Sequence, residues 1–150
     1  MTLIELVNKF RTALENMNPL DFAGTSLSVS KFPDASCDDA SLLLAAFLVD
    51  NGYPNSYVIR GSSGGNNSEL QSHVWLELNG IQIDITADQF NKYGYNNDAI
   101  ILESDNQFLK TFESINDGEG DFRSFVLKYN DAGLMSHFEE CYQSIIEAVA

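Results

Sequence analysis

The sequence predicts an α+β fold in which N-terminal helices and a C-terminal helix pack on an antiparallel β-sheet. Apolar residues recur at helical spacing in residues 2–17 and again in the last segment, residues 133–150. Between them, the alternating segment "HVWLEL-NG-IQIDIT", residues 73–86, has at its centre a dipeptide typical of a two-residue hairpin turn. No repeat and no linker-like change of composition divides the chain, so residues 1–150 are expected to form one domain.

A second helix is expected over residues 37–50, "CDDASLLLAAFLVD", and it is opened by Cys37. Residues 42–48 are apolar on nearly every side of this helix, which is typical of a central, buried position. Ser36 is the expected N-cap, with Asp39 three residues on as its capping-box partner.

The remaining elements are assigned from shorter patterns. "SYVIRG", "AIILE" and "FRSFVLKY", which span residues 56–61, 99–103 and 122–129, predict strands, with a helix around residues 105–114. The polar, Gly/Ser/Asn-rich segment 61–72 is either a flap or a loose surface connection. The closing helix is expected to bury one stripe, formed by Leu134, Phe138, Cys141, Tyr142, Ile145 and Val149.

The charge balance bears on the class of partner. Eight Lys and Arg residues against 22 Asp and Glu give a net charge of −14, which repels phosphate backbones and disfavours nucleic acid as a ligand. The acidity either attracts a cationic partner or simply makes a well-solvated surface. No segment reaches the ~18 apolar residues of a membrane span, and the N-terminus lacks the pattern of a signal peptide. We therefore expect a cytoplasmic protein, or one exported without an N-terminal signal peptide.

The hairpin register predicts which side chains meet. A two-residue turn pairs Leu78 with Ile81, and it places alternate residues on two faces. The apolar face is formed by Val74, Leu76, Leu78, Ile81, Ile83 and Ile85. The opposite face is formed by His73, Trp75, Asp84 and Thr86. His73 and Asp84 are diagonal neighbours, with Cα atoms roughly 7–8 Å apart or less, so imidazole and carboxylate are expected to form a hydrogen bond.

Cys37 completes a set of groups that nucleophilic catalysis requires. A thiol at the first turn of a buried helix meets N–H groups that favour the thiolate and an oxyanion. A histidine oriented by a carboxylate is the usual base or counter-ion for such a thiol. Asp38 and Asp39 suit the helix start but oppose a thiolate, so His73 is expected to supply most of the compensating charge. Two cysteines and two widely separated histidines match neither a zinc pattern nor a disulfide framework, and no cofactor is expected.

The order of these residues resembles the transglutaminase-like branch of the papain-like cysteine protease superfamily. The resemblance covers about residues 30–90: a cysteine that opens a buried helix, "HVWLEL", and then "IDIT" on the next strand. It implies a papain/transglutaminase-like fold with Cys37 as nucleophile, His73 as base and Asp84 as the orienting acid. The implied reaction is amide hydrolysis, deamidation or transamidation of a peptide or protein through an acyl-enzyme thioester.

Two flanking residues are candidates for substrate contacts. Trp75 either walls the site or packs beneath it. No separate oxyanion-hole side chain matches the resemblance, and Gln89 in "TADQF" is the position where we look for one. Four nearby acids would attract a cationic peptide or an amine acceptor: Asp34, Asp38, Asp39 and Asp88.

Two other functions compete with this prediction. The first is a catalytically inactive binding module whose acidic surface takes a basic partner. The second is acyl transfer from a thioester such as coenzyme A, as in the arylamine acetyltransferases, for which the chain is short and offers no basic patch. His137 and Cys141 lie one turn apart on the last helix, where packing or surface roles are expected. Neither the substrate nor the oligomeric state follows from the sequence.

Overall fold

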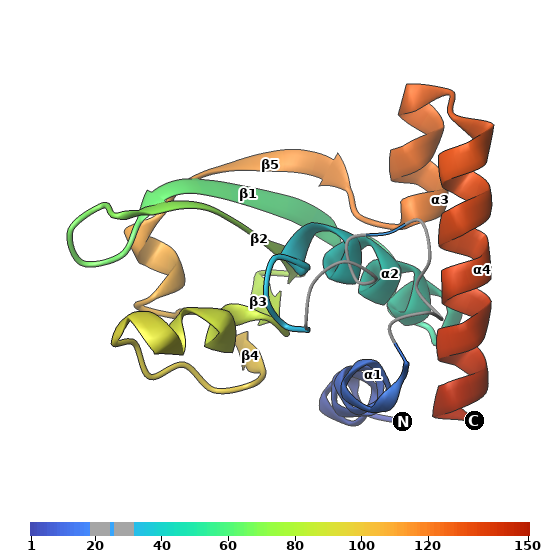
Figure 1. The fold of residues 1–150 in the computed structure, drawn as a ribbon, viewed down its shortest axis with the longest axis horizontal. Helices are drawn as coiled ribbons and strands as arrows, with labels where there is room; N and C mark the ends of the chain where they lie inside the picture. Colours follow the sequence, from blue (N-terminus) through green and yellow to red (C-terminus); the bar gives the residue numbers. More distant parts are fainter. Residues whose placement is uncertain (19–24, 26–31) are drawn as a thin grey trace.

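An antiparallel sheet with the strand order β4-β3-β2-β1-β5 forms the centre of the computed structural model, which describes residues 1–18, 25 and 32–150 (Figure 1). Its strands are β1 (Tyr57–Gly64), β2 (Leu70–Leu78), β3 (Ile81–Asp84), β4 (Ile101–Glu103) and β5 (Glu113–Glu119). The helices are α1 (Leu3–Asn16), α2 (Cys37–Asp50), α3 (Phe122–Phe125) and α4 (Ala132–Val149). Three 3₁₀ segments are η3 (Ala87–Tyr93), η4 (Leu109–Thr111) and η5 (Val126–Tyr129). The predicted α+β class with an antiparallel sheet is therefore confirmed.

The β2–β3 hairpin has the predicted register. Leu78 pairs with Ile81 and Leu76 with Ile83. Asn79 and Gly80 have φ angles of 50° and 83°, the left-handed values that a type I′ turn needs at both central positions. The register fixes which side chains of β2 and β3 face each layer of the molecule.

The predicted helices α1 and α2 are both present, but the cap of α2 differs. Thr2 and Glu5 form a reciprocal capping box at the start of α1. The capping box expected for α2 is wrong, because the Ser36 side chain makes no cap hydrogen bond and its hydroxyl instead donates to the Pro33 carbonyl, 3.0 Å away. The first turn of α2 therefore has no side-chain cap from Ser36.

Two predictions in the second half of the chain are wrong. Residues 122–129, expected as a strand, form α3 and η5, because Phe122, Phe125 and Val126 are buried at helical spacing. The helix expected around residues 105–114 is reduced to the short turn η4, and the strand β5 follows it directly. The sheet thus takes its outer strand from a segment without an apolar pattern.

The segment 61–72, expected as a flap or a loose connection, is mostly strand. β1 continues to Gly64 and β2 begins at Leu70, so the connection between them is short. Its tip is hydrogen-bonded to later parts of the chain. The Gly65 amide donates to Thr111 Oγ1 at 2.8 Å, and the Tyr95 hydroxyl donates to Glu69 at 2.7 Å.

Two apolar clusters occupy opposite sides of the sheet. The larger one joins the helices to the predicted apolar face of the hairpin, which includes Val74, Leu76, Leu78, Ile83 and Ile85. The smaller one lies on the other side and comprises Ile59, Leu70, Trp75, Ala87, Phe90, Ile101, Leu109 and Phe112. On α4, Phe138, Cys141 and Ile145 of the predicted stripe are buried, and Leu134, Tyr142 and Val149 are half-buried.

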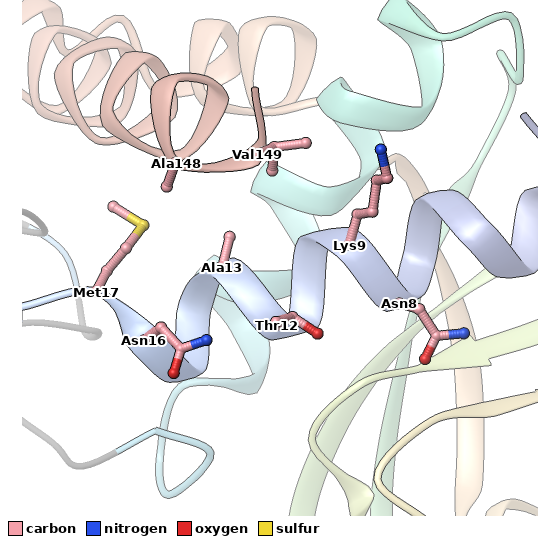
Figure 2. A pocket seen from close by; sticks show the side chains of 8 residues that line it. All are labelled: Asn8, Lys9, Thr12, Ala13, Asn16, Met17, Ala148 and Val149. Carbon is pink, nitrogen blue, oxygen red and sulfur yellow. The ribbon is translucent and has the colours of Figure 1, made fainter.

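α1 contacts both α4 and α2, and α2 is the helix that packs on β1 and β2 (Figure 1). Between α1 and α4 is a cavity of about 360 Å³, into which Ala13, Met17 and Val149 contribute apolar atoms (Figure 2). In the part of the chain that the structure describes, no helix combines the length and the apolar composition that crossing a membrane requires.

Candidate functional site

His73 and Asp84 form a buried pair on the β2–β3 hairpin. The distance from His73 Nε2 to Asp84 Oδ2 is 2.5 Å, and both side chains are almost completely excluded from solvent. The other carboxylate oxygen of Asp84 accepts hydrogen bonds from the backbone N–H of Thr86 at 2.9 Å and from its hydroxyl at 3.3 Å. A carboxylate held at both oxygens fixes the orientation of the imidazole.

The pair gives His73 a strong preference for its protonated form. Burial of the ring lowers the pKa of His73, but the Asp84 carboxylate and, to a smaller extent, the Cys37 thiol outweigh burial and raise the pKa to about 10. The second ring nitrogen, Nδ1, is buried, and no side chain among the described residues meets hydrogen-bond geometry with it. Cys37 therefore influences the imidazole without forming a regular hydrogen bond to it.

Aromatic rings surround His73 on the sheet face opposite α2. The ring of Phe90 meets it edge-on at a centroid distance of 5.0 Å, and Trp75 and Phe112 lie at 5.6 and 5.7 Å. A Cβ atom added at Gly61, the residue opposite His73 on β1, would lie 2.7 Å from Phe112. The absence of a side chain at this position lets Phe112 approach the sheet and close the aromatic shell.

Cys37 is half-buried at the start of α2, and the acid that follows it is paired within the chain. Arg60 on β1 contacts Asp38 at 3.3 Å and Asp117 on β5 at 3.1 Å. His73 is expected to compensate negative charge near the thiol, and Arg60 is a second cation that does so. Its contact with Asp38 reduces the electric field that the Asp38 carboxylate exerts on the thiol.

Gln89 and Trp75 occupy different positions relative to Cys37. Gln89 lies on η3, next to the loop that precedes Cys37 (residues 32–36, the cysteine loop). Its side-chain oxygen accepts a hydrogen bond from the Ala35 N–H at 3.3 Å, and its amide nitrogen donates one to the Thr86 carbonyl at 2.9 Å. Trp75 packs against His73, is only 2% exposed, and donates from Nε1 to Gln82 at 2.6 Å. Trp75 is therefore held in place by the His73 ring on one side and by Gln82 at its indole nitrogen.

Arg11 is a residue near the site that sequence reasoning missed. Its buried guanidinium forms two hydrogen bonds to Asp88, at 2.8 and 2.9 Å, and donates to the Ile85 and Ala99 carbonyls. It therefore ties α1 to the turn that follows Asp84. A signal was available, because Arg11 lies four residues after Val7 on the apolar stripe of α1, where an arginine needs buried partners.

Acids near the site that were expected to attract a cationic ligand form ion pairs within the chain. Asp34 contacts Lys92 at 3.1 Å, Asp38 contacts Arg60, and Asp88 contacts Arg11. Their charge is compensated within the chain, which weakens the local attraction for a cationic peptide.

Two cavities of the described residues are lined by none of Cys37, His73 and Asp84. One is the α1–α4 cavity (Figure 2), and the other has about 430 Å³ and is lined in part by Trp75 and Phe112. Among residues 1–18, 25 and 32–150, no three His, Cys, Asp or Glu side chains are grouped closely enough to hold a metal ion.

Comparisons with protein-family models, with curated proteins and with solved structures found no match to this chain. The functional interpretation of the site therefore depends on its own geometry and charges.

Proposed function

We propose that this protein is a cysteine-dependent acyl-transfer enzyme that acts on a peptide or protein amide. Cys37 is the nucleophile, His73 its base and counter-ion, and Asp84 the residue that orients the imidazole. The observation that carries the proposal is the buried His73–Asp84 pair, with Nε2 and Oδ2 2.5 Å apart, whose imidazole is also influenced by the Cys37 thiol. The finer fold assignment, a papain/transglutaminase-like arrangement, belongs to the same proposal.

The proposed reaction has two steps. The Cys37 sulfur attacks the amide carbonyl carbon, the C–N bond breaks, and protonated His73 gives its proton to the leaving amine. Water then hydrolyses the thioester, or an amine resolves it by transamidation, while neutral His73 takes the proton of the attacking group and the sulfur leaves as the thiolate. The Ser36 side chain makes no cap hydrogen bond at the start of α2, and the start of a helix presents backbone N–H groups of the kind that bind an oxyanion.

Energetics support a functional role for the pair. Burying two charged groups costs several kcal/mol of hydration each, and replacement by apolar side chains is often neutral or stabilising. An imidazolium held next to a thiol at a helix start is the arrangement that activates cysteine nucleophiles. A catalytic role of the pair therefore explains why the protein bears the free-energy cost of burying it.

A second candidate is an inactive binding module that presents an acidic surface to a basic partner. The complete burial of His73 beneath its aromatic shell favours this alternative, because a substrate would have to reach Cys37 from the side of α2.

Alkylation distinguishes the two candidates. Iodoacetamide is applied to the folded protein from about pH 5 to about pH 9, and adducts at Cys37 and Cys141 are quantified by mass spectrometry. An enzyme with an activated thiolate labels fast at Cys37 well below pH 8, and His73→Gln abolishes that low-pH reaction. Equal, slow labelling of both cysteines, unchanged in His73→Gln, contradicts the proposal. Cys37→Ala is the control in a parallel screen with acyl-amide probes.

A further inference from the structure

We propose that Gln89 is a positioning residue that holds the cysteine loop, residues 32–36, against the turn after Asp84. The inference rests on the proposed function and deepens it, because it names a residue that acts through Cys37 rather than on substrate. It starts from the two hydrogen bonds of the Gln89 side chain, which reach the two segments that carry the candidate nucleophile and the candidate orienting acid.

The first hydrogen bond reaches a strained point of the backbone. Ala35, two residues before Cys37, has a φ angle of 52°, in the left-handed region that non-glycine residues rarely adopt. Gln89 Oε1 accepts the Ala35 N–H at 3.3 Å. Strained residues persist where neighbouring groups hold them in place, and the Gln89 side chain supplies such a contact.

The second hydrogen bond reaches the turn that supports the acid. Gln89 Nε2 donates to the Thr86 carbonyl at 2.9 Å, and the N–H and hydroxyl of the same Thr86 bind Asp84. From Asp84 the path continues through His73 to the Cys37 thiol. The contacts form a closed ring from Cys37 through Ala35, Gln89, Thr86, Asp84 and His73 back to Cys37.

Both polar atoms of the Gln89 amide are used within the protein. Gln89 binds the Ala35 N–H with its oxygen and the Thr86 carbonyl with one N–H of its nitrogen, so the amide is held in one orientation between two backbone segments. Loss of Gln89 is therefore expected to misplace the thiol relative to the imidazole rather than to change which substrate binds. A small misplacement of a reacting group has large kinetic effects.

The neighbouring residue Lys92 offers a matched control. Lys92 is on the same 3₁₀ segment and contacts Asp34 of the same loop at 3.1 Å, but both side chains are about half exposed. Exposed ion pairs contribute little to structure. Lys92→Gln therefore removes a contact between the same two segments without removing the hydrogen bonds that we propose to matter.

The test measures the second-order rate of Cys37 alkylation by iodoacetamide from about pH 5 to about pH 9. Gln89→Met keeps the length of the side chain and removes both hydrogen bonds. We expect it to slow the low-pH reaction about tenfold, and to shift the pH profile toward that of His73→Gln. Gln89→Glu, which can still accept from Ala35, is expected to retain an intermediate rate, and Lys92→Gln to stay within about twofold of the wild type.

The outcomes separate this inference from the proposed function. If the wild type and His73→Gln have the same pH profile, the proposed function fails whatever Gln89 does. If they differ and Gln89→Met has the wild-type profile, the positioning role is overturned and the proposed function stands. Should Gln89→Met not fold, Gln89→Asn, which is too short to span both partners, decides: a wild-type rate overturns the inference, and a reduced rate in a folded protein supports it.

Discussion

His73 is completely buried, and its pKa is raised well above the ordinary value of a histidine. Removing one partner of such a buried pair leaves the other charge uncompensated, which typically costs about 3–5 kcal/mol. Asp84 and the thiol of Cys37 both favour the imidazolium against the opposing effect of burial. The protonation state of one ring therefore affects both the stability of the fold and the chemistry proposed for Cys37.

The raised pKa of His73 predicts how stability depends on pH. The pKa in the folded state, about 10, lies above the ordinary value of 6.5. The protonated ring therefore contributes stability that is fully present below about pH 6.5 and is lost as the pH rises toward the folded-state pKa. The check is NMR of the imidazole signals, with His137→Gln to assign the two histidines and chemical denaturation in parallel. Titration of His73 near its ordinary pKa contradicts the prediction.

Arg60 predicts a second effect on Cys37. Arg60→Gln leaves the Asp38 carboxylate without its partner, one residue from the thiol, so alkylation of Cys37 is expected to slow about threefold at low salt. Asp38→Asn in the same background should restore the rate, because it removes the charge that Arg60 compensates. Rates measured for the wild type, both single variants and the double variant complete the cycle. Equal effects of Arg60→Gln with and without Asp38 would show that Arg60 acts by another route.

At the scale of elements, sequence patterns predicted the helices and strands whose formation depends on neighbouring residues. α1, α2 and the β2–β3 hairpin were predictable because each has a strong apolar period, and the hairpin also has a turn that only certain residues adopt. β5 was not predictable from the sequence. It is an outer strand (Glu113–Glu119) whose side chains are mostly exposed, so the sequence there has no apolar alternation. The apolar residues at 122, 125 and 126 fit a helical period as well as part of a strand, and tertiary packing selects the helix.

The close packing of Phe112 on the β1–β2 hairpin predicts how adding a methyl group at Gly64 changes the stability of the protein. A Cβ at Gly64 would overlap the Phe112 ring, so Gly64→Ala is expected to lower the free energy of unfolding by about 2 kcal/mol. Phe112→Leu in the same background should recover part of the loss. Gly133→Ala is the control, because its new Cβ would lie 3.5 Å from the nearest atom. Denaturant unfolding measures all of them, and equal stabilities for Gly64→Ala and the wild type contradict this packing.

At the scale of the molecule, the candidate site depends on contacts between distant segments. The positions of Cys37, His73 and Asp84 could be predicted because a helix start and a hairpin register are local. The roles of Arg11 and Arg60 could not, because their partners lie 77 and 22 residues away and only the packing of α1 and α2 on the sheet brings them together. Gln89 was identified from its position in the sequence, but its hydrogen bond to Ala35 spans 54 residues.

The net charge of −14 predicts the response of the whole molecule to salt. Repulsion among the excess carboxylates opposes the compact state, and salt screens it. The melting temperature is expected to rise by about 2–5 °C between about 20 mM and about 300 mM NaCl, with KCl giving the same shift. Circular dichroism during heating measures it. A falling melting temperature would mean that internal ion pairs such as those of Arg11 and Arg60 outweigh the repulsion.

Because Trp75 packs against His73, the tryptophan fluorescence of this protein reports on the surroundings of the imidazole. The sequence contains a single tryptophan, and its ring lies 5.6 Å from the imidazole. All indole emission therefore comes from one place beside the candidate site. Because an imidazolium quenches a neighbouring indole, fluorescence intensity will follow the proton on His73, and the chemistry of the site can be timed in solution without attaching a dye.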